Sequence, residues 1–174
     1  MFGIQFYIGK QINFVLMQTI GLGGGCHWCT EAVFLSLRGV HQVEQGWIAS
    51  QPPNDAFSEA VIVTYDPAII TLADLITIHL YTHAATSNHS MRYKYRSAVY
   101  WFEEQDEKVI KEILASLQPQ FEALIITQVL PFAVFRPSLP EHLNYYYSNP
   151  EKPFCTLYIH PKLELLKKKF APLT

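Results

Sequence analysis

The sequence predicts an α+β fold: a ferredoxin-like split βαβ sheet with helices on one face, an extra helix and strand, and an irregular C-terminal tail. The order of segments carries this prediction, because residues 19–102 follow the pattern strand, helix, strand, strand, helix, strand. With 174 residues, the chain fits one domain that buries its own core. Its 49% hydrophobic and 16% charged residues are typical of a globular protein.

A glycine-rich junction separates the first predicted strand from the first helix. The apolar run 19–22 is typical of a strand, and the glycines at 23–25 lead into an amphipathic segment that ends at Gly39. Residues 40–49 alternate loosely as a second strand, and residues 58–65 alternate clearly as a third.

A capping motif opens the second helix. Thr71 and Asp74 have the spacing of a capping box, and apolar residues recur with helical spacing up to Leu80. The remaining predicted elements are a strand over 96–102, a charged helix over 103–117, a strand over 124–130, a helical turn near 140–147 and a basic terminal helix over 161–170.

Residues 1–16 differ in character from the rest of the chain. They are apolar but interrupted by Lys10 and several glutamines, they are too short for a membrane span, and they lack the basic start of a secretory signal. Met17 leads directly into the first strand. We therefore expect residues 1–16 to be an N-terminal extension and residues 17–174 to be a single domain with a C-terminal tail.

Charge and cysteine content narrow the function classes. A formal net charge of −2 gives no reason to expect binding to nucleic acid or to an anionic membrane surface. Three cysteines, two of them in a C-x-x-C pair, indicate thiol chemistry or metal binding in a reducing compartment rather than a disulfide framework. We expect a cytoplasmic protein that acts as a monomer.

Cys26 is the first candidate functional residue, because it lies between the glycines and the predicted helix. The partial positive charge of a helix N-terminus favours the thiolate, and glycines leave the sulfur open to a substrate. A protonated His27 would lower the thiol pKa further, while Trp28 offers a flat apolar wall or else packs in the core. Cys29 falls one turn inside the helix. The structural alternative, two buried thiols beside a tight turn, leaves the pair of cysteines unexplained.

Three further residues are candidates on weaker grounds. Glu59 lies among apolar strand residues, where desolvation would keep it protonated as a general acid requires, unless it is an exposed edge residue. Tyr95 precedes a strand and can donate to a polarised oxygen, although the chain has ten tyrosines. Cys155 is either a resolving thiol on a mobile proline-rich tail or an exposed bystander. We interpret the histidines without ligand spacing as surface or packing residues: His41, His79, His83, His142 and His160.

Together these residues resemble the A-type peptide methionine sulfoxide reductases, the family that acts on the S epimer of methionine sulfoxide. Four blocks carry the resemblance, and they occur in the family's order over most of the span from Thr19 to Cys155. The family's glycine-rich Cys-Phe-Trp motif with its later Glu reads Gly24-Gly25-Cys26-His27-Trp28-Cys29-Thr30-Glu31. The other blocks are Ser58-Glu59 through Tyr65-Asp66-Pro67, Lys94-Tyr95-Arg96-Ser97-Ala98, and Asn149-Pro150 with Phe154-Cys155.

The resemblance implies a single catalytic domain and a role for each candidate. Cys26 would attack the sulfoxide sulfur, Glu59 would protonate its oxygen, and Tyr95 would hydrogen-bond that oxygen. Trp28 would hold the methyl group, and Trp47, where the family usually has tyrosine, would line the same pocket. A neutral acid and a thiolate within reach of one ligand suit this chemistry, because a sulfoxide oxygen leaves poorly until it is protonated.

The resemblance also implies how the enzyme is recycled. Attack would leave a sulfenic acid on Cys26, which condenses with a second thiol to a disulfide. Cys155 matches the family's recycling cysteine, but Cys29 is an extra thiol close to the nucleophile that could resolve it instead. Thioredoxin or a similar dithiol would then restore the reduced enzyme, with no bound cofactor or metal.

Several positions depart from the family pattern. His27 replaces a phenylalanine of the methyl pocket, and Lys94 stands where glutamine is usual. The family's Asn-Asp aligns with His89-Ser90, so an assisting carboxylate is missing, and Glu141-His142-Leu143 replaces Tyr-His-Gln. These departures are typical of a divergent branch, and they leave substrate preference open between free and protein-bound methionine sulfoxide.

Two other functions fit part of the pattern. Small copper-carrying domains share the βαββαβ order and a C-x-x-C at the same junction, but they are much shorter and give no role to Glu59 or Tyr95. A thioredoxin-like disulfide exchanger also has C-x-x-C at a helix N-terminus. The third alternative is a catalytically inactive member of the family that retains only the fold.

Overall fold

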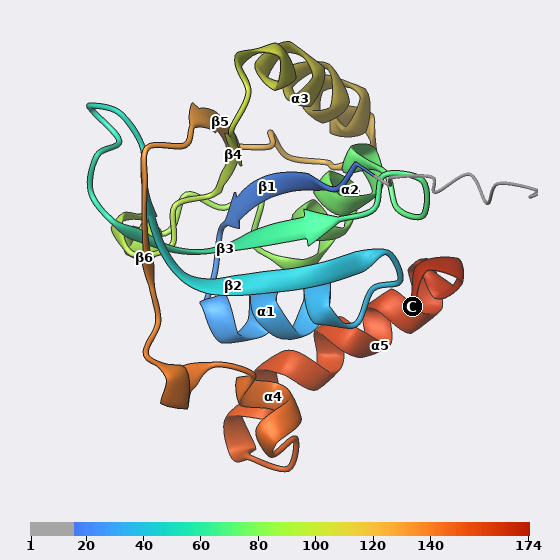
Figure 1. The fold of residues 1–174 in the computed structure, drawn as a ribbon. Helices are drawn as coiled ribbons and strands as arrows, with labels where there is room; N and C mark the ends of the chain where they lie inside the picture. The colour runs from blue at the N-terminus through green and yellow to red at the C-terminus, as the bar shows by residue number, and fades with distance from the viewer. Residues whose placement is uncertain (1–15) are drawn as a thin grey trace, which may run out of the picture.

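Residues 16–174 are described by a computed structural model; residues 1–15, and with them nearly all of the expected N-terminal extension, lie outside the described residues. The described part of the chain forms a six-stranded sheet in the order β5-β4-β1-β3-β2-β6 (Figure 1). The strands are β1 (Gln18–Gly23), β2 (Val40–Ala49), β3 (Ser58–Tyr65), β4 (Ala98–Trp101), β5 (Gln128–Pro131) and β6 (Val134–Pro137). The helices are α1 (His27–Leu35), α2 (Leu72–Thr82), α3 (Glu104–Leu117), α4 (Tyr145–Ser148) and α5 (His160–Lys169).

The four central strands confirm the predicted split βαβ arrangement. β1 pairs antiparallel with both β3 and β4, and β2 pairs antiparallel with β3. The two outer strands differ from the prediction. β5 pairs parallel with β4, because α3 crosses over between them, so the sheet is mixed rather than wholly antiparallel. β6 pairs with β2 in a region that was expected to be irregular.

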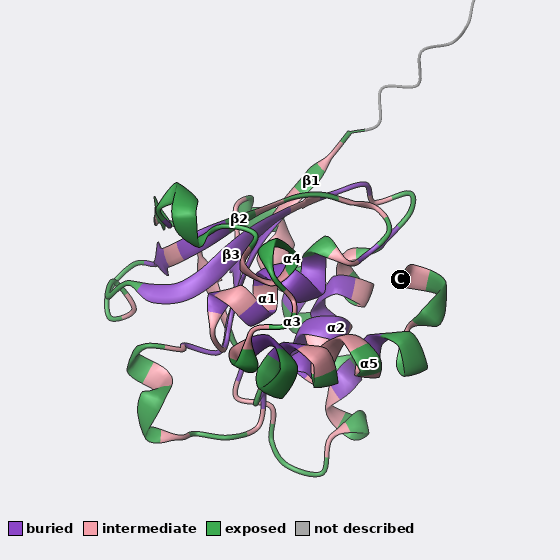
Figure 2. Cartoon of the chain, turned by 90° about the horizontal axis from the view of Figure 1, so that it is seen from below, coloured by how far each residue is buried: buried purple, intermediate pink, exposed green. Residues whose placement is uncertain are grey.

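The helices cover one face of the sheet, as predicted. Alternation along β3 turns Val61, Val63 and Tyr65 toward a core that also holds Phe34 of α1 and Ile110 of α3. On the opposite face a smaller cluster packs around Ile48, Ala60, Ile62, Ala98 and Tyr100. Figure 2 shows the buried residues concentrated in the central strands and in α1 and α2.

The predicted capping box of the second helix is present. The Thr71 hydroxyl oxygen accepts the backbone N–H of Asp74 at 3.1 Å, and the Asp74 carboxylate accepts the Thr71 N–H at 3.0 Å. These two bonds satisfy donors that the helix start would otherwise leave unpaired, and they begin α2 at Leu72.

The chain after β6 contains the predicted helical turn and basic terminal helix, but the tail between them is less irregular than expected. It holds α4, a π-helical turn at Cys155–Ile159 and α5, and Figure 1 shows α5 running beside α1. A buried carboxylate fastens this segment: Glu31 of α1 accepts the backbone N–H of Asn144 at 2.9 Å and of Tyr145 at 3.3 Å. Gln45 of β2 donates to the same carboxylate at 2.9 Å. Within residues 16–174, no helix is long and apolar enough to cross a membrane.

Candidate active site

Cys26 lies at the start of α1, in the N-cap position, with its thiol half-buried. The pKa of Cys26 is lowered, and the largest cause is hydrogen bonding by the Cys29 thiol, one turn further along the helix. The backbone N–H groups of Trp28 and Cys29 act in the same direction, while burial and the nearby Glu59 oppose it. The pKa of Cys26 is therefore lowered, the direction that the sequence predicted, but its largest cause is Cys29 and the predicted contribution of His27 is not among the main causes.

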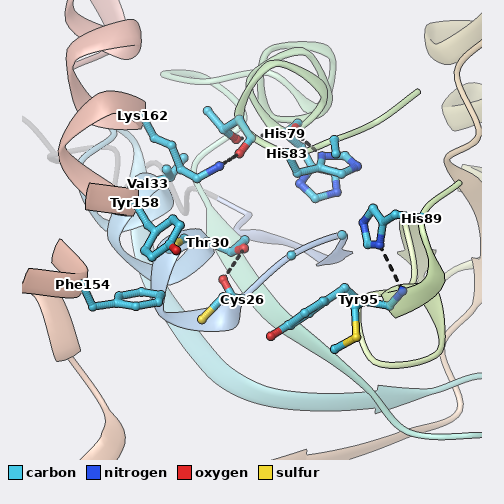
Figure 3. A pocket seen from close by; sticks show the side chains of 16 residues that line it. Cys26, Thr30, Val33, His79, His83, His89, Tyr95, Phe154, Tyr158 and Lys162 are labelled. Carbon is cyan, nitrogen blue, oxygen red and sulfur yellow. Dashed lines mark hydrogen bonds between the residues drawn. The ribbon is translucent and has the colours of Figure 1, made fainter. Parts of the chain in front are cut away.

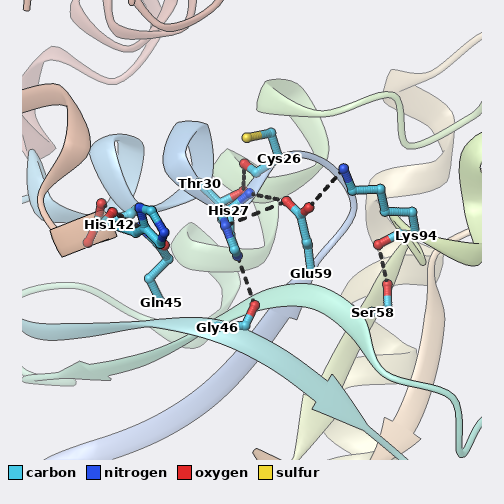
Figure 4. A network of polar contacts seen from close by, with 10 residues as sticks. Cys26, His27, Thr30, Gln45, Gly46, Ser58, Glu59, Lys94 and His142 are labelled. Atoms are coloured by element: carbon cyan, nitrogen blue, oxygen red, sulfur yellow. Dashed lines mark hydrogen bonds and ion pairs between the residues drawn. The ribbon is translucent and has the colours of Figure 1, made fainter. Parts of the chain in front are cut away.

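Glu59 comes to the same place from β3. The strand alternation turns its side chain to the helix-covered face, where only 6% of the residue is exposed. Its Oε2 accepts the backbone N–H of His27 at 3.1 Å, and the ammonium of Lys94 lies 3.3 Å from its Oε1 (Figure 4). The alternative of an exposed edge glutamate is therefore wrong. Its carboxylate faces the first turn of the helix that carries Cys26.

An aromatic cluster lies beside this carboxylate, which it meets through His27. The His27 Nδ1–H donates to the carbonyl of Gly46 at 3.0 Å, which turns Nε2 toward Glu59 Oε2 at 3.8 Å. The His27 ring meets Trp47 edge-on at 5.0 Å and Trp28 at 6.1 Å. Trp47 stands directly opposite Glu59 in the β2–β3 register, so their side chains share one face. The three predicted pocket residues thus form one cluster.

Trp28 also contacts the C-terminal segment. Its ring stacks on Tyr145 with the centroids 4.1 Å apart and the planes 4° from parallel, and Phe154 meets it edge-on at 5.6 Å. One face of the indole is therefore covered by α4. Its Nε1–H is buried and has no hydrogen-bond partner among the residues that the structure describes.

A cavity of about 730 Å³ opens beside Cys26. Its lining comes from the glycine junction, α1, α2, the Tyr95 loop and α5, and Figure 3 shows the Tyr95 side chain reaching toward Cys26. Cys26, Cys29 and Tyr95 line this cavity, whereas Glu59, His27, Trp28 and Trp47 do not. Cys26 therefore stands between the cavity on one side and the carboxylate with its aromatic cluster on the other.

Comparison with known proteins agrees with this geometry. Residues 18–173 match the family described as "Peptide methionine sulfoxide reductase". The chain is 34% identical over 166 residues to the peptide methionine sulfoxide reductase MsrA of Thermus thermophilus, covering 87% of this chain and 94% of that protein. It is 30% identical to MsrA of Sulfolobus acidocaldarius, covering 88% and 96% of the two chains. The chain belongs to the peptide methionine sulfoxide reductase family.

Solved structures support the same fold. The oxidised form of Mxr1 from Saccharomyces cerevisiae is similar with a TM-score of 0.64 at 26% identity, covering 77% of this chain and 82% of that one. Methionine sulfoxide reductase A of Corynebacterium diphtheriae gives a TM-score of 0.65 at 24% identity, covering 77% and 76%. The predicted family, fold class and enzyme class are confirmed.

Within this methionine sulfoxide reductase, the glycine junction is shaped by a histidine pair. A Cβ at Gly24 would collide with the ring of His83, whereas a Cβ at Gly25 would meet nothing within 4 Å. Gly24 therefore permits a close approach of α2, and Gly25 leaves open space next to Cys26.

The two histidines behind the junction are packing residues, as predicted, and they also line the cavity. His79 Nε2–H donates to Gly23 O at 2.9 Å, and His83 Nδ1–H donates to His79 O at 2.6 Å while its Nε2 accepts from Ser97 at 2.8 Å. Burial lowers the pKa of His79 to about 4, and it lowers that of His83 well below its ordinary value. Both rings are therefore neutral near pH 7.

Lys94 takes a place in the site that the sequence did not predict. The sequence showed that lysine replaces the family's glutamine at this position, but it did not show that Lys94 forms an ion pair with Glu59. The Tyr95 hydroxyl and then Glu59 raise the pKa of Lys94, so the ammonium links these two predicted residues. No group of three or more His, Cys, Asp or Glu side chains that could hold a metal ion occurs within residues 16–174.

Cys155 is neither exposed nor on an irregular segment. It is fully buried in the π-helical turn and packs with Cys29, Ala32 and Ile159, so the exposed-bystander alternative is wrong. Burial raises the pKa of Cys155, and Lys152 partly offsets this. All three cysteines are free thiols. The three cysteines lie close together, because Cys26 packs against the cluster that holds Cys29 and Cys155.

Proposed function

We propose that this family member reduces methionine S-sulfoxide, free or in peptides and proteins, to methionine, with Cys26 as the nucleophile. One observation carries the proposal: a thiol of lowered pKa at the N-terminus of α1 adjoins a buried glutamate that the next residue's backbone holds by a 3.1 Å hydrogen bond. A nucleophile and a proton-carrying group at one point are what sulfoxide reduction requires.

The first step transfers an oxygen atom. The Cys26 thiolate attacks the sulfoxide sulfur, and the oxygen takes up one proton and bonds to the Cys26 sulfur as its bond to the substrate sulfur breaks. The products are a sulfenic acid on Cys26 and methionine. Two electrons pass from Cys26 to the substrate sulfur. The one proton required comes through Glu59 and its partner Lys94, whose ammonium lies 3.3 Å from the carboxylate. Tyr95, which lines the cavity with Cys26, donates to the sulfoxide oxygen.

The methyl group of the substrate is held by the aromatic cluster around Glu59. Trp28 and Trp47 supply apolar ring surface, and His27 replaces the phenylalanine of the family motif. Because the His27 ring is bonded to Gly46, it keeps a fixed orientation as a ring of phenylalanine would.

Cys29 is the first resolving thiol in this proposal. Cys26 packs against the cluster that holds both Cys29 and Cys155, but Cys29 is one turn from Cys26 on the same helix and has the largest effect on the Cys26 pKa. The Cys29 sulfur attacks the sulfenic sulfur, a disulfide forms, and water leaves. Cys155, packed with Cys29, is then placed to exchange with the Cys26–Cys29 disulfide and pass it onward.

A dithiol reductant completes the cycle, without a bound cofactor or metal. Thioredoxin is our candidate, since yeast Mxr1, similar to this chain with a TM-score of 0.60 at 22% identity, has been crystallised in complex with Trx2. Free thiols at all three cysteines suit a reducing compartment, and we propose the cytoplasm.

We further propose that the protein acts as a monomer, which size-exclusion chromatography would test. We also propose that residues 17–174 fold without residues 1–16, which deletion of residues 1–16 would test.

Turnover of separated epimers tests the function. Reduced protein is incubated with the S or the R epimer of methionine sulfoxide, free and in a peptide, with dithiothreitol as reductant. We expect consumption of the S epimer only and no turnover by Cys26→Ser. Glu59→Gln separates this function from a thioredoxin-like exchanger or a copper module, because thiol exchange and copper binding survive that change whereas sulfoxide reduction does not. Turnover retained by Cys26→Ser would refute the nucleophile assignment.

A further inference from the structure

The C-terminal segment places a lysine in the active-site cavity. Lys162 of α5 is among the residues that line the cavity with Cys26 and Cys29, and Figure 3 shows its side chain reaching from α5 toward α2. Its Nζ donates to the backbone carbonyl of Thr82, at the end of α2. This bond holds a long, otherwise flexible side chain in one position.

Lys162 brings a positive charge to the lining of the cavity. The neighbouring His79 and His83 are neutral near pH 7, because burial lowers the pKa of both rings. Among the lining residues, all of which lie in the described part of the chain, Lys162 is the one lysine or arginine. Burial lowers its pKa, and Cys29 and Cys26 raise it, so the ammonium and the thiols act on one another.

The Cys29 thiol needs such a partner. Its hydrogen bond to Cys26, its burial and the charges of Cys26 and Cys155 all raise its pKa. Among the main influences on Cys29, the Lys162 ammonium acts in the opposite direction and lowers its pKa. A buried thiol that keeps its proton is a poor nucleophile, because the thiolate is the reacting form.

We propose that Lys162 is a positioning residue for disulfide formation: its ammonium stabilises the Cys29 thiolate while that sulfur attacks the sulfenic acid of Cys26. In this step the Cys29–Cys26 S–S bond forms and the S–O bond of the sulfenic acid breaks. The thiol proton and the departing hydroxyl leave as water, and the two cysteines together are the oxidised product. The proposal rests on the proposed function, with Cys29 as the resolving thiol.

A single-turnover experiment separates this step from the first one. Reduced protein is mixed with a methionine S-sulfoxide peptide without reductant, and samples are quenched over time. Methionine peptide reports the first step, and mass mapping of the Cys26–Cys29 disulfide reports the second. The variants are Lys162→Met, Lys162→Arg and, as a matched control, Lys168→Met, which removes an exposed lysine from the same helix.

We expect Lys162→Met to slow disulfide formation about tenfold, the change that about one pKa unit of a thiol would produce, and to slow the release of methionine peptide much less. Lys162→Arg should restore most of the disulfide rate, and Lys168→Met should match the wild type. If Lys162→Met does not fold, Lys162→Gln, which keeps a donor for Thr82 but no charge, gives the same two readouts.

Two results would overturn the role of Lys162. One is disulfide formation at the wild-type rate in the uncharged variants, and the other is equal slowing of both steps, which a merely structural role would cause. Absence of methionine peptide from the wild-type reaction is a different failure, because it refutes the proposed function itself. A wild-type disulfide that joins Cys26 to Cys155 would also refute the proposal, while leaving sulfoxide reduction in place.

Discussion

The backbone N–H of His27 donates to Glu59 Oε2 at 3.1 Å, which links the residue after the nucleophile to a carboxylate 32 positions further along the chain. The same helix N-terminus thus holds the Cys26 thiol and the group that would deliver the proton. Because the first turn of α1 both carries the thiol and binds the carboxylate, it fixes their relative orientation.

Removal of the carboxyl group should therefore affect the first step selectively. Glu59→Gln keeps the size of the side chain and an acceptor for the His27 N–H, but it cannot carry the proton. We expect the single-turnover rate of methionine formation to fall by about 10²- to 10⁴-fold, the usual contribution of general acid catalysis. Lys94→Gln, which restores the residue usual in the family, serves as the comparison and should fall by much less. Equal rates for wild type and Glu59→Gln would exclude Glu59 as the acid.

The lowered pKa of Cys26 has a testable dependence on Cys29. Since the thiolate is the reactive form, alkylation of Cys26 by iodoacetamide should persist to lower pH than for an ordinary cysteine, and it should be lost as the pH falls through the folded pKa. Cys29→Ala removes the hydrogen-bond donor, so the midpoint should move to higher pH. Cys29→Ser keeps an O–H donor and should move it less. Mass mapping of the alkylated Cys26 peptide measures both. A midpoint that is the same in both variants and the wild type would contradict the hydrogen bond.

The buried histidines should make stability depend on pH. The pKa of His79 is lowered to about 4 by burial, so between pH 6.5 and 4 the unfolded chain binds a proton that the folded chain does not. The stabilisation is present above pH 6.5 and is lost as the pH falls toward 4, by about 3 kcal/mol for a shift of this size. Urea unfolding at several pH values measures it. His79→Gln should flatten this dependence, whereas the exposed-site control His41→Gln should not; identical slopes in all three proteins would contradict a neutral buried His79.

The carboxylate of Glu31 should hold the C-terminal segment in place. It accepts backbone N–H groups from Asn144 and Tyr145 and the amide of Gln45, and the residue is only 3% exposed. Glu31→Ala leaves these donors without an acceptor, which costs about 1–3 kcal/mol for each buried group left unpaired. We expect a lower free energy of unfolding and faster proteolytic cleavage near Asn144. Glu44→Ala, at an exposed site on β2, is the control. Unchanged cleavage in Glu31→Ala would show that the aromatic contacts alone hold the segment.

Local patterns in the sequence accounted for the centre of this fold. The glycine junction predicted the turn between β1 and α1, and the alternation along β3 placed Glu59 on the face of Val61 and Val63, where the structure has it. The Thr71–Asp74 capping box was likewise readable, since it joins residues three apart.

The contacts that complete the site could not be predicted in this way. Lys162 binds Thr82, 80 positions away, and Glu31 binds Asn144, 113 positions away. Local sequence periodicity cannot predict contacts over such separations. β6 is four residues long and ends at a proline, so its sequence is typical of a loop. It is a strand only because it pairs with β2, which is distant in the sequence. Burial of Cys155 depends on the same long-range packing, and the sequence therefore left that residue open between a resolving thiol and a bystander.

The central claim is that the Cys26 sulfur itself receives the sulfoxide oxygen, and trapping of the sulfenic acid tests it most directly. In the double variant Cys29→Ser, Cys155→Ser, Cys26 is the remaining thiol of the chain. One turnover with methionine S-sulfoxide in the presence of dimedone should give one dimedone adduct on the Cys26 peptide for each methionine formed. Methionine formed in equal amount without an adduct on Cys26 would contradict the account.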